Sequence, residues 1–338
     1  MPEEAFISFV VIAYNEAAAI AKTLTAIMAL AGLGSHEIIV VDDGSRDNTA
    51  EIVAGLASRD PSIRLIKLEA NKGRGYARST GIAAARGELI ATVDADIVLP
   101  GDWLARTRAA LPGHDAVGGT AVPDGDVAYI HHRFRLVPRV VPATTTVAGS
   151  NGLYRREVFD VATFDPALRE GEDSALNHAM ERHGLSCLTV PGLLVEHEES
   201  KPLGTSLRWL FDVGRGATRQ MLTYGEVRQP DVAAAGFAGA VTAGALLAIR
   251  RRRLIGLALP TGFVLAASVQ HVRSRFETPP RQWSVVTAAV AVDSAMLTSY
   301  FAGRITGLAA QCRRRANRRL SPYICKAAMT RSTIVSQL

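Results

Sequence analysis

The sequence predicts an α/β protein with a doubly wound, mostly parallel sheet flanked by helices, followed by a helical C-terminal region. Short runs rich in Val and Ile alternate with Ala-rich segments of helical length up to about residue 94. Beyond about residue 230, long apolar runs replace this alternation. We therefore expect an α/β domain over residues 1–230, hydrophobic helices over 231–310 and a basic tail over 311–338.

The expected strands are short and rich in β-branched residues, and they lie at Phe6–Ala13, Glu37–Val41, Ile63–Leu68 and Leu89–Val93. The helices between them are expected at residues 16–30, Ala50–Ser58 and Gly75–Ala85. In such sheets, ligands bind outside the carboxyl ends of the strands. Polar residues that directly follow these four strands are therefore the candidates for a functional site.

Composition excludes several classes of protein. A hydrophobic content of 48% over 338 residues excludes a largely disordered chain. Residues 1–200 carry 18 Lys and Arg against 27 Asp and Glu, whereas residues 201–338 carry 20 against 5. Because the arginines of the basic part are interleaved with long Ala, Val, Leu and Gly runs, we expect a membrane partner and no nucleic acid. The three cysteines are far apart, which disfavours a disulfide framework or a zinc site.

Pairs of aspartates follow two of the expected strands. Asp94 and Asp96 in VDADI stand one residue apart, so an extended chain points both carboxylates the same way and lets them share a hard cation. Asp43 belongs to VVDDGS, after another strand. The alternative interpretations are a solvated turn for the first pair and an Asx turn that caps the next helix for the second.

Five segments together resemble, in order and spacing, the motif series of family-2 glycosyltransferases over about residues 6–200. They read VVIAYNE, VVDDGSRDNT, NKGRGYARSTGIAAARGELIATVDADI, GSNGLYRREVF and GEDSALNHAMERHG. The resemblance implies a GT-A fold and an inverting, metal-dependent transfer of a sugar from a nucleoside-diphosphate sugar. The N-terminus shows no signal peptide, so we expect the catalytic domain in the cytoplasm.

The resemblance also implies roles for individual residues at the donor side. It assigns the nucleotide base and ribose to Ala13, Tyr14, Glu16 and Asp43. It places Asp94 near the ribose or the sugar, and Asp96 on a divalent Mg²⁺ or Mn²⁺ to which Asp94 also contributes. Related enzymes often carry a histidine near the diphosphate, which makes His197 a candidate third ligand, although a histidine at a strand end is often only structural.

The segment NKGRGYAR supplies Lys72 and Arg78 beside two glycines, a composition that suits a loop closing on phosphate or sugar. The alternative is the solvated, basic start of a helix. A dinucleotide-binding fingerprint is disfavoured, because Arg78 stands where its third glycine belongs and the loop follows the third strand instead of the first.

The remaining candidates lie on the acceptor side. The resemblance makes Asp173 the general base that deprotonates the acceptor, with Glu172 as its neighbour or as an acceptor ligand. The alternative is two acidic residues that only cap a helix. Gly149, Ser150 and Asn151 are expected to form the floor under the sugar, unless they are a plain turn. Arg208 and Trp209 resemble an interfacial acceptor-side helix, although packing alone is an alternative for Trp209.

The C-terminal third contains apolar runs at Val232–Ile249, Leu254–Val269 and Trp283–Gly303. Three spans would place Arg250–Arg253 on the outer side, against the positive-inside tendency. We therefore expect a re-entrant or interfacial first segment and two spans, in a multi-pass protein of the cell membrane. The alternative is a soluble helical domain.

These inferences predict a glycosyltransferase that uses a nucleotide-sugar donor, UDP ahead of GDP. Its acceptor would be a polyprenyl phosphate, a lipid-linked oligosaccharide or an exopolysaccharide. A sugar nucleotidyltransferase is the rival enzyme, but it needs a Gly-rich, Lys-bearing loop after its first strand, where this chain has YNEAAAI. A non-catalytic membrane scaffold is the second rival, and the joint presence of Asp43, Asp94, Asp96 and Asp173 argues against it.

Overall fold

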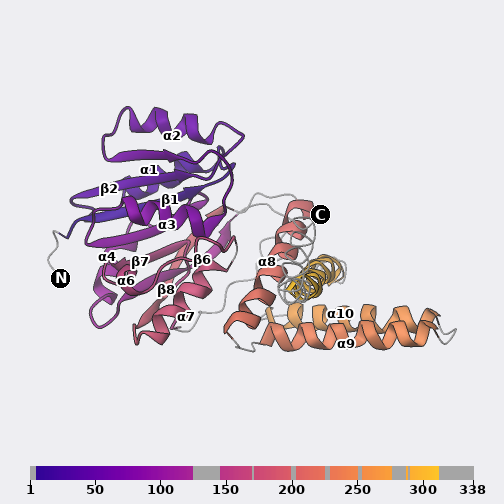
Figure 1. Cartoon of the computed structure of the whole chain (residues 1–338). Helices are drawn as coiled ribbons and strands as arrows, with labels where there is room; N and C mark the ends of the chain where they lie inside the picture. Colours follow the sequence, from indigo (N-terminus) through magenta and orange to yellow (C-terminus); the bar gives the residue numbers. More distant parts are fainter. Residues whose placement is uncertain are drawn as a thin grey trace, which may run out of the picture. The chain divides into compact units, whose positions relative to one another are not determined.

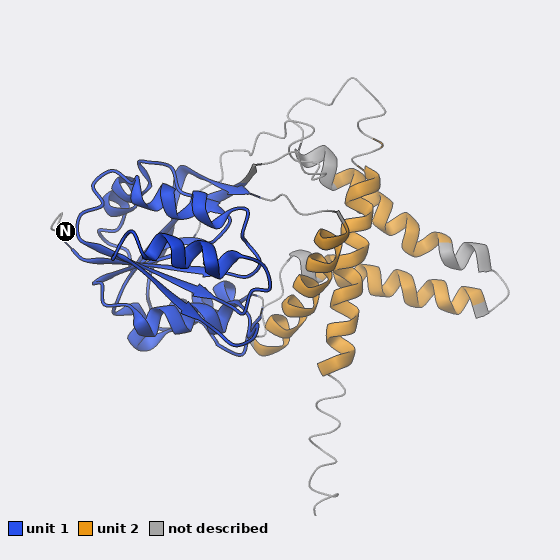
Figure 2. Cartoon of the chain, turned by 90° about the horizontal axis from the view of Figure 1, so that it is seen from above, with its two compact units in different colours: residues 1–203, 273–286 blue, residues 204–272, 287–338 orange. Residues whose placement is uncertain are grey.

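The computed structural model describes residues 5–124, 145–169, 171–198, 203–224, 229–249, 253–275, 287 and 290–311. The chain forms two compact units. One comprises residues 1–203 with 273–286, and the other residues 204–272 with 287–338 (Figure 2). The first unit holds the sheet, and the second is helical wherever it is described (Figure 1).

Four parallel strands form one half of the sheet of the first unit. They are β1 (Ile7–Ala13), β2 (His36–Asp42), β3 (Ile63–Lys67) and β4 (Leu89–Asp94), in the spatial order β3-β2-β1-β4. The helices between them are α1 (Ile20–Met28), α2 (Thr49–Ala57) and α3 (Arg74–Ala84). These elements confirm the predicted strand–helix alternation to within a few residues, apart from the later start of α1.

The other half of the sheet is mixed. Its elements are β5 (Ile97–Val98), α4 (Trp103–Ala110), β6 (Ala116–Asp124), β7 (Asn151–Arg155), α6 (Val158–Val161), α7 (Glu172–Arg182) and β8 (Cys187–Glu198). The order continues β4-β7-β6-β8-β5, in which β7 runs antiparallel to β4 and β6, and β8 runs parallel to β6 and antiparallel to β5. The prediction of a mostly parallel sheet thus holds for the first four strands and is corrected for the others.

Helices cover both faces of the sheet because successive strand side chains point to opposite sides. Ile7, Phe9 and Val11 pack with buried residues of α1, α2 and α4 in one core. Val10 and Ile12 pack with buried residues of α3, α6 and α7 in the other. The doubly wound arrangement leaves the loops at the carboxyl ends of the strands as the place for chemistry.

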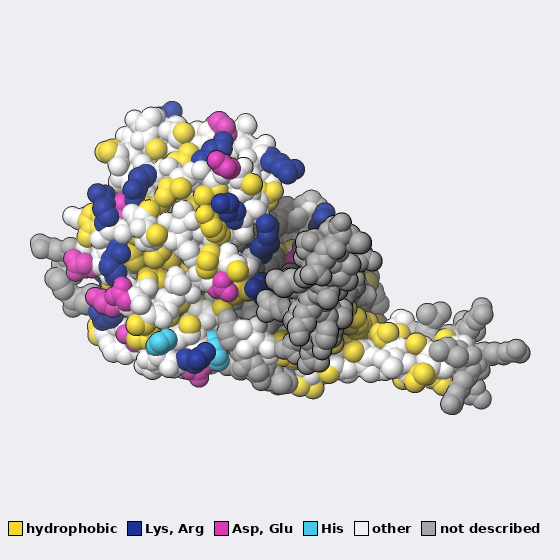
Figure 3. Space-filling model, viewed as in Figure 1, with side chains coloured by type: hydrophobic (Ala, Val, Ile, Leu, Met, Phe, Trp, Pro, Cys, Tyr) yellow, Lys and Arg dark blue, Asp and Glu magenta, His cyan; other side chains and the backbone are white. Residues whose placement is uncertain are grey.

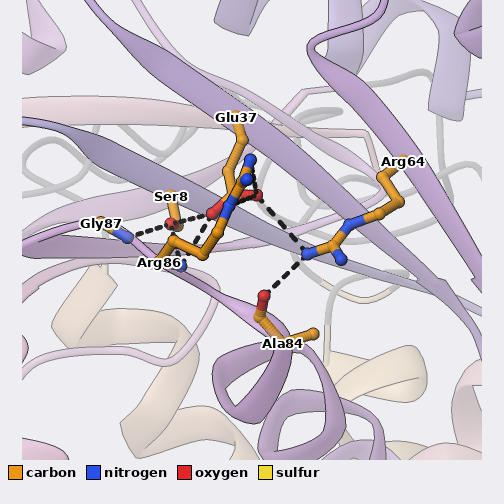
Figure 4. Close-up of polar contacts among 6 residues, drawn as sticks. All are labelled: Ser8, Glu37, Arg64, Ala84, Arg86 and Gly87. Carbon is orange, nitrogen blue, oxygen red and sulfur yellow. Dashed lines mark hydrogen bonds and ion pairs between the residues drawn. The ribbon is translucent and has the colours of Figure 1, made fainter.

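A buried carboxylate stabilises the opposite edge of the sheet. Glu37, near the start of β2, accepts hydrogen bonds from Ser8 Oγ at 2.7 Å and from the backbone N–H of Arg86 at 2.8 Å (Figure 4). The guanidinium groups of Arg86 and Arg64 approach its second oxygen at 3.2 and 3.5 Å. Burial alone would raise the pKa of Glu37, but the hydrogen bonds from Ser8 and Arg86 outweigh it and hold the pKa below its ordinary value.

This network predicts a pH-dependent stability. Glu37→Gln is expected to lower the free energy of unfolding by about 2 kcal/mol at pH 7, because a charge-assisted hydrogen-bond acceptor is lost. A lowered folded-state pKa contributes stability that is complete above the unfolded pKa of about 4.3 and is lost as the pH falls through the folded pKa. Urea unfolding at pH 7 and pH 4 measures the effect. The free energies of unfolding of Glu37→Gln and wild type should differ less at pH 4 than at pH 7. An equal difference at both pH values would contradict the ionised state assigned to Glu37.

The second unit consists of α8 (Leu203–Tyr224), α9 (Gln229–Ile249), α10 (Arg253–Arg275) and a helical segment at residues 290–311. Phe237 and Phe301 stack at 4.9 Å in its small core. Gly303 lets the last helical segment approach α8, since a Cβ there would lie 1.9 Å from the Phe211 carbonyl oxygen. The region is therefore helical, as expected, and it includes α8, which the sequence analysis had placed with the first domain.

Hydrophobic side chains lie at the surface along α9 and α10 (Figure 3). Val232, Leu246 and Leu265 are among the exposed ones. Within the described residues, no helix is both long and apolar enough to cross a membrane, so the predicted spans are not confirmed. Arg250, Arg251 and Arg252, and the tail from residue 312 onward, lie outside the described residues.

Candidate active site

Four loops meet at one edge of the sheet because they follow the carboxyl ends of four adjacent parallel strands. They begin after Ala13 of β1, Asp42 of β2, Lys67 of β3 and Asp94 of β4. Backbone bonds attach two of these loops to the end of β1: the Asp43 N–H donates to the Ala13 carbonyl at 2.8 Å, and the Ala95 N–H to the Ile12 carbonyl at 3.1 Å. The loops that carry the polar residues after the four strands therefore lie together, as the sequence predicted.

The loops after β1 and β2 are fastened to each other by side chains. The Asn15 backbone N–H donates to Ser45 Oγ at 2.9 Å, and the Arg46 N–H donates to Asn15 Oδ1 at 2.8 Å. The Glu16 N–H donates to Thr49 Oγ1 at 2.9 Å. Asn15 adopts a left-handed φ of 57°, which asparagine tolerates better than most residues. Glu16 thereby contributes its backbone to the loop architecture, and its predicted contact with a nucleotide stays a prediction.

Asp43 organises the loop after β3. Its Oδ1 accepts from the Lys72 backbone N–H at 2.7 Å, and its Oδ2 accepts from the Gly73 N–H at 2.8 Å. Arg169 fastens the same loop from outside, with its guanidinium donating to Asn71 Oδ1 at 2.7 Å and to the Asn71 carbonyl at 2.9 Å. Asp43 therefore holds the segment Asn71–Gly73 in place. A direct contact between Asp43 and a nucleotide stays a prediction.

A cavity of about 550 Å³ opens between these loops. Its lining consists of Tyr14, Gly44, Ser45, Arg46, Lys67, Leu68, Glu69, Ala70 and Asn71. Gly44 has a φ of 72°, and a Cβ there would lie 2.6 Å from the Ala70 carbonyl carbon, so glycine is required at this wall. An aromatic ring, a carboxylate and two cationic side chains around a cavity of this size suit a nucleoside.

Arg78 joins two carboxylates, Asp94 and Glu172, for which the sequence predicts roles on the donor and acceptor sides. Its side chain is 2% exposed, and its Nη2 lies 2.5 Å from Asp94 Oδ1, while Nη1 is hydrogen bonded to Glu172 Oε1. The guanidinium also lies over the Phe164 ring, 5.3 Å from its centroid. A Cβ at Gly149 would come 3.0 Å from the Arg78 Cζ. The segment Gly149–Asn151, called the GSN loop below, therefore rests directly on the guanidinium. The Arg78 guanidinium is thus paired with protein carboxylates, and its predicted role toward phosphate or sugar stays a prediction.

The two acidic residues at the start of α7 have different surroundings. The Glu172 side chain is only 3% exposed, and burial raises its pKa while the Arg78 charge opposes that rise. Asp173 is half-buried, and its Oδ1 accepts the Ser174 N–H at 2.7 Å. Because Glu172 is committed to an internal ion pair, Asp173 is the carboxylate of the two that remains accessible to an acceptor.

Asp96 and His197 meet at the other side of the D-x-D pair. His197 Nε2 lies 3.1 Å from Asp96 Oδ2, and β5 and β8 hold the two residues in register through the Ile97–His197 pairing. Carboxylate oxygen and imidazole nitrogen are ligands that divalent transition ions accept. Asp94 is turned to Arg78 instead, and among the described residues no group of three or more His, Cys, Asp and Glu could hold a metal ion. Asp96 and His197 could therefore supply two ligands to a divalent cation, and this role stays a prediction.

The other predicted residues are placed as follows. The Ser150 carbonyl accepts the Asp94 N–H at 3.1 Å, and the buried Asn151 accepts the Gly119 N–H at 2.6 Å, so this loop supports β4 and β6. The Lys72 ammonium lies 4.4 Å from the centroid of the Tyr76 ring. Arg208 and Trp209 are exposed on α8 in the second unit, and their acceptor-side role stays a prediction.

Sequence reasoning gave no role to several residues that support the site. Asn177 on α7 binds both the N–H and the carbonyl of Val147, at 2.9 and 2.8 Å, just before the GSN loop. On α1, Lys22 contacts β8 on both sides of His197, and Thr23 contacts the turn of the D-x-D pair. Each of these contacts joins residues at least 30 positions apart, so spacing along the chain gives no signal for them.

Comparison with known proteins identifies the sheet unit. Residues 8–162 match the sequence model described as "Glycosyl transferase family 2". Residues 8–162 form a family-2 glycosyl transferase domain. The predicted family is thereby confirmed, and the matched segment contains the loops after β1 to β4.

Relatives of the glycosyl transferase domain share about a third of their residues with it. The succinoglycan biosynthesis protein ExoO of Rhizobium meliloti is 35% identical over 211 residues, which cover 55% of this chain and 58% of that protein. An undecaprenyl-phosphate 4-deoxy-4-formamido-L-arabinose transferase of Shewanella sediminis is 34% identical over 182 residues, 49% of this chain and 55% of that protein. The chain thus matches a little over half the length of these curated relatives.

A solved structure supports the fold. A mannosyltransferase from Pyrobaculum calidifontis, in complex with GDP-Man and Mn²⁺, superposes with a TM-score of 0.56 at 18% identity, covering 90% of this chain and 87% of that one. At this identity, the likeness concerns the fold alone, and it supports a GT-A-like arrangement in which the observed mixed sheet lies between helices.

Proposed function

We propose that the chain transfers a sugar, with inversion, from a nucleoside-diphosphate sugar to an acceptor at a membrane face. The observation that carries the proposal is the buried Arg78, which joins Asp94 of the D-x-D pair to Glu172 beside Asp173. Because of this link, the carboxylates expected to serve donor and acceptor belong to one site. The nucleoside would occupy the cavity beside Tyr14, and UDP is the preferred nucleotide.

The residues of the site have separate tasks in this reaction. Asp173 takes the proton of the acceptor hydroxyl as the new bond to the anomeric carbon forms, and a phosphate acceptor needs no such base. A single carboxylate opposite the leaving group favours in-line displacement and therefore inversion. Asp96 and His197 would hold Mg²⁺ or Mn²⁺, which neutralises charge on the departing nucleoside diphosphate. The GSN loop, resting on Arg78, forms the floor of the sugar site.

The proposed acceptor is a polyprenyl phosphate, a lipid-linked oligosaccharide or a growing exopolysaccharide. One relative is named as an undecaprenyl-phosphate sugar transferase, which refers to a polyprenyl phosphate. Another is named for the biosynthesis of succinoglycan, an exopolysaccharide. Residues 201–338 carry 20 Lys and Arg but only 5 Asp and Glu. This positive charge favours contact with an anionic lipid surface. We therefore place the domain at the cytoplasmic face of the cell membrane.

Ligand binding tests the donor side of this proposal. UDP with Mn²⁺ is expected to raise the melting temperature, since a ligand at 100 times its Kd stabilises the folded state by about 2.7 kcal/mol. Asp96→Ala should remove the part of the shift that depends on Mn²⁺. The control is Arg59→Ala, at an exposed position after α2, which should respond like wild type. If no nucleoside diphosphate shifted the melting temperature with either metal, the proposed donor site would be wrong.

A further inference from the structure

Two adjacent residues of α1 contact the turn and the strand that carry the proposed metal ligands. Thr23 is 1% exposed, and its Oγ1 donates to the Ala95 carbonyl at 2.7 Å. Ala95 is the central residue of the D-x-D pair, directly before Asp96. Thr23 therefore fixes the backbone from which the Asp96 side chain projects.

Lys22 acts on the other strand. Its ammonium lies 2.6 Å from Glu196 Oε1 and 2.5 Å from Glu198 Oε1, the residues on either side of His197 in β8. Side chains alternate along a strand, so the two glutamates can hold Lys22 on one face while His197 projects from the other. The Glu198 N–H also donates to the Asp96 carbonyl at 2.8 Å, which joins β8 to the turn after β4.

We propose that Lys22 and Thr23 are positioning residues that set the separation of Asp96 and His197 for a divalent cation. This inference rests on the metal site of the proposed function. Lys22 is 49% exposed, and exposed ion pairs contribute little to the free energy of folding. We therefore expect the contacts of Lys22 with the two glutamates to affect the position of His197 more than the stability of the domain. Outer contacts of this kind orient metal ligands, and their loss typically weakens metal affinity by about 10- to 100-fold.

Matched substitutions at the two positions separate positioning from folding. Thr23→Val keeps the shape but removes the hydroxyl, whereas Thr23→Ser keeps the hydroxyl. Lys22→Met removes the charge, whereas Lys22→Arg keeps it. We expect Thr23→Val and Lys22→Met to raise the Kd for Mn²⁺ by about 10-fold, with Thr23→Ser and Lys22→Arg close to wild type.

The measurement is electron paramagnetic resonance of free Mn²⁺ during titration of the full chain, with and without UDP and corrected for the Mn²⁺–UDP complex. Asp96→Ala serves as the reference for a lost site, and UDP affinity without metal should be unchanged in all α1 variants. If Asp96→Ala lost the metal while Thr23→Val and Lys22→Met bound it like wild type, the positioning role alone would be overturned. An equal loss of Mn²⁺ affinity in Thr23→Ser and Lys22→Arg would also overturn the positioning role, because it would show a purely structural effect. If wild type bound no Mn²⁺, or Asp96→Ala bound it normally, the metal site would fall together with this inference.

Discussion

Replacing Asp173 by Asn is expected to lower the turnover number for sugar transfer to a hydroxyl acceptor by about 10²-fold or more. A hydroxyl is a poor nucleophile at neutral pH, so a carboxylate within hydrogen-bonding reach must take its proton. Asn keeps the shape of the side chain but cannot accept that proton. Glu172 cannot replace it in this role, because its carboxylate is buried against Arg78. Steady-state kinetics with a defined hydroxyl acceptor measures the effect.

The control for this variant is Asp160→Asn, which makes the same change at an exposed position of α6 and should leave turnover unchanged. The affinity for nucleotide and metal should also stay near the wild-type value in Asp173→Asn, because the loss concerns only the transition state. Full activity of Asp173→Asn would exclude the assigned base. A product that retained the anomeric configuration of the donor, observed by nuclear magnetic resonance, would exclude the inverting mechanism itself.

The first half of the fold was predictable because its signals are local. Apolar strands such as β1 and β2 are buried along almost their whole length, and the segments between them have helical length and composition. Local signals also placed Ala13, Asp43 and Asp94 at strand ends. The second half was not predictable in this way. The pairing of β7 with β4 and β6 joins segments distant in sequence, and a five-residue run such as Asn151–Arg155 carries no information about its direction.

Side-chain roles were less predictable than positions. A basic residue near glycines suits an anion, so the sequence predicts a role toward phosphate or sugar for Arg78. Its burial depends on Glu172, 94 positions away, and on the close approach of Gly149. Asp43 was assigned to the nucleotide, yet both of its oxygens accept backbone N–H groups of Lys72 and Gly73. In both cases, the sequence shows which chemical group is present, and only the fold shows which partner it has.

Arg78→Met is expected to destabilise the glycosyl transferase domain by about 3 to 5 kcal/mol, the cost of leaving a buried charge without its partner. The substitution leaves Asp94 and the buried Glu172 without the guanidinium that pairs them. By contrast, Arg86 is 73% exposed beside Glu37, and Arg86→Met should cost less than about 1 kcal/mol. Urea unfolding followed by the fluorescence of the buried Trp103, in a background without the other tryptophans, gives both values.

A double-mutant cycle shows whether the cost of Arg78→Met arises from the ion pair or from lost packing on Phe164. If the unpaired carboxylate dominates, adding Glu172→Gln should recover part of the stability, with a coupling energy of about 1 to 3 kcal/mol. Arg78→Lys should fall between wild type and Arg78→Met, because one ammonium cannot satisfy two carboxylates in the geometry of a guanidinium. Additive effects of Arg78→Met and Glu172→Gln would show that the two side chains are not coupled. The link between the donor-side and acceptor-side carboxylates, on which the proposed site depends, would then have to be abandoned.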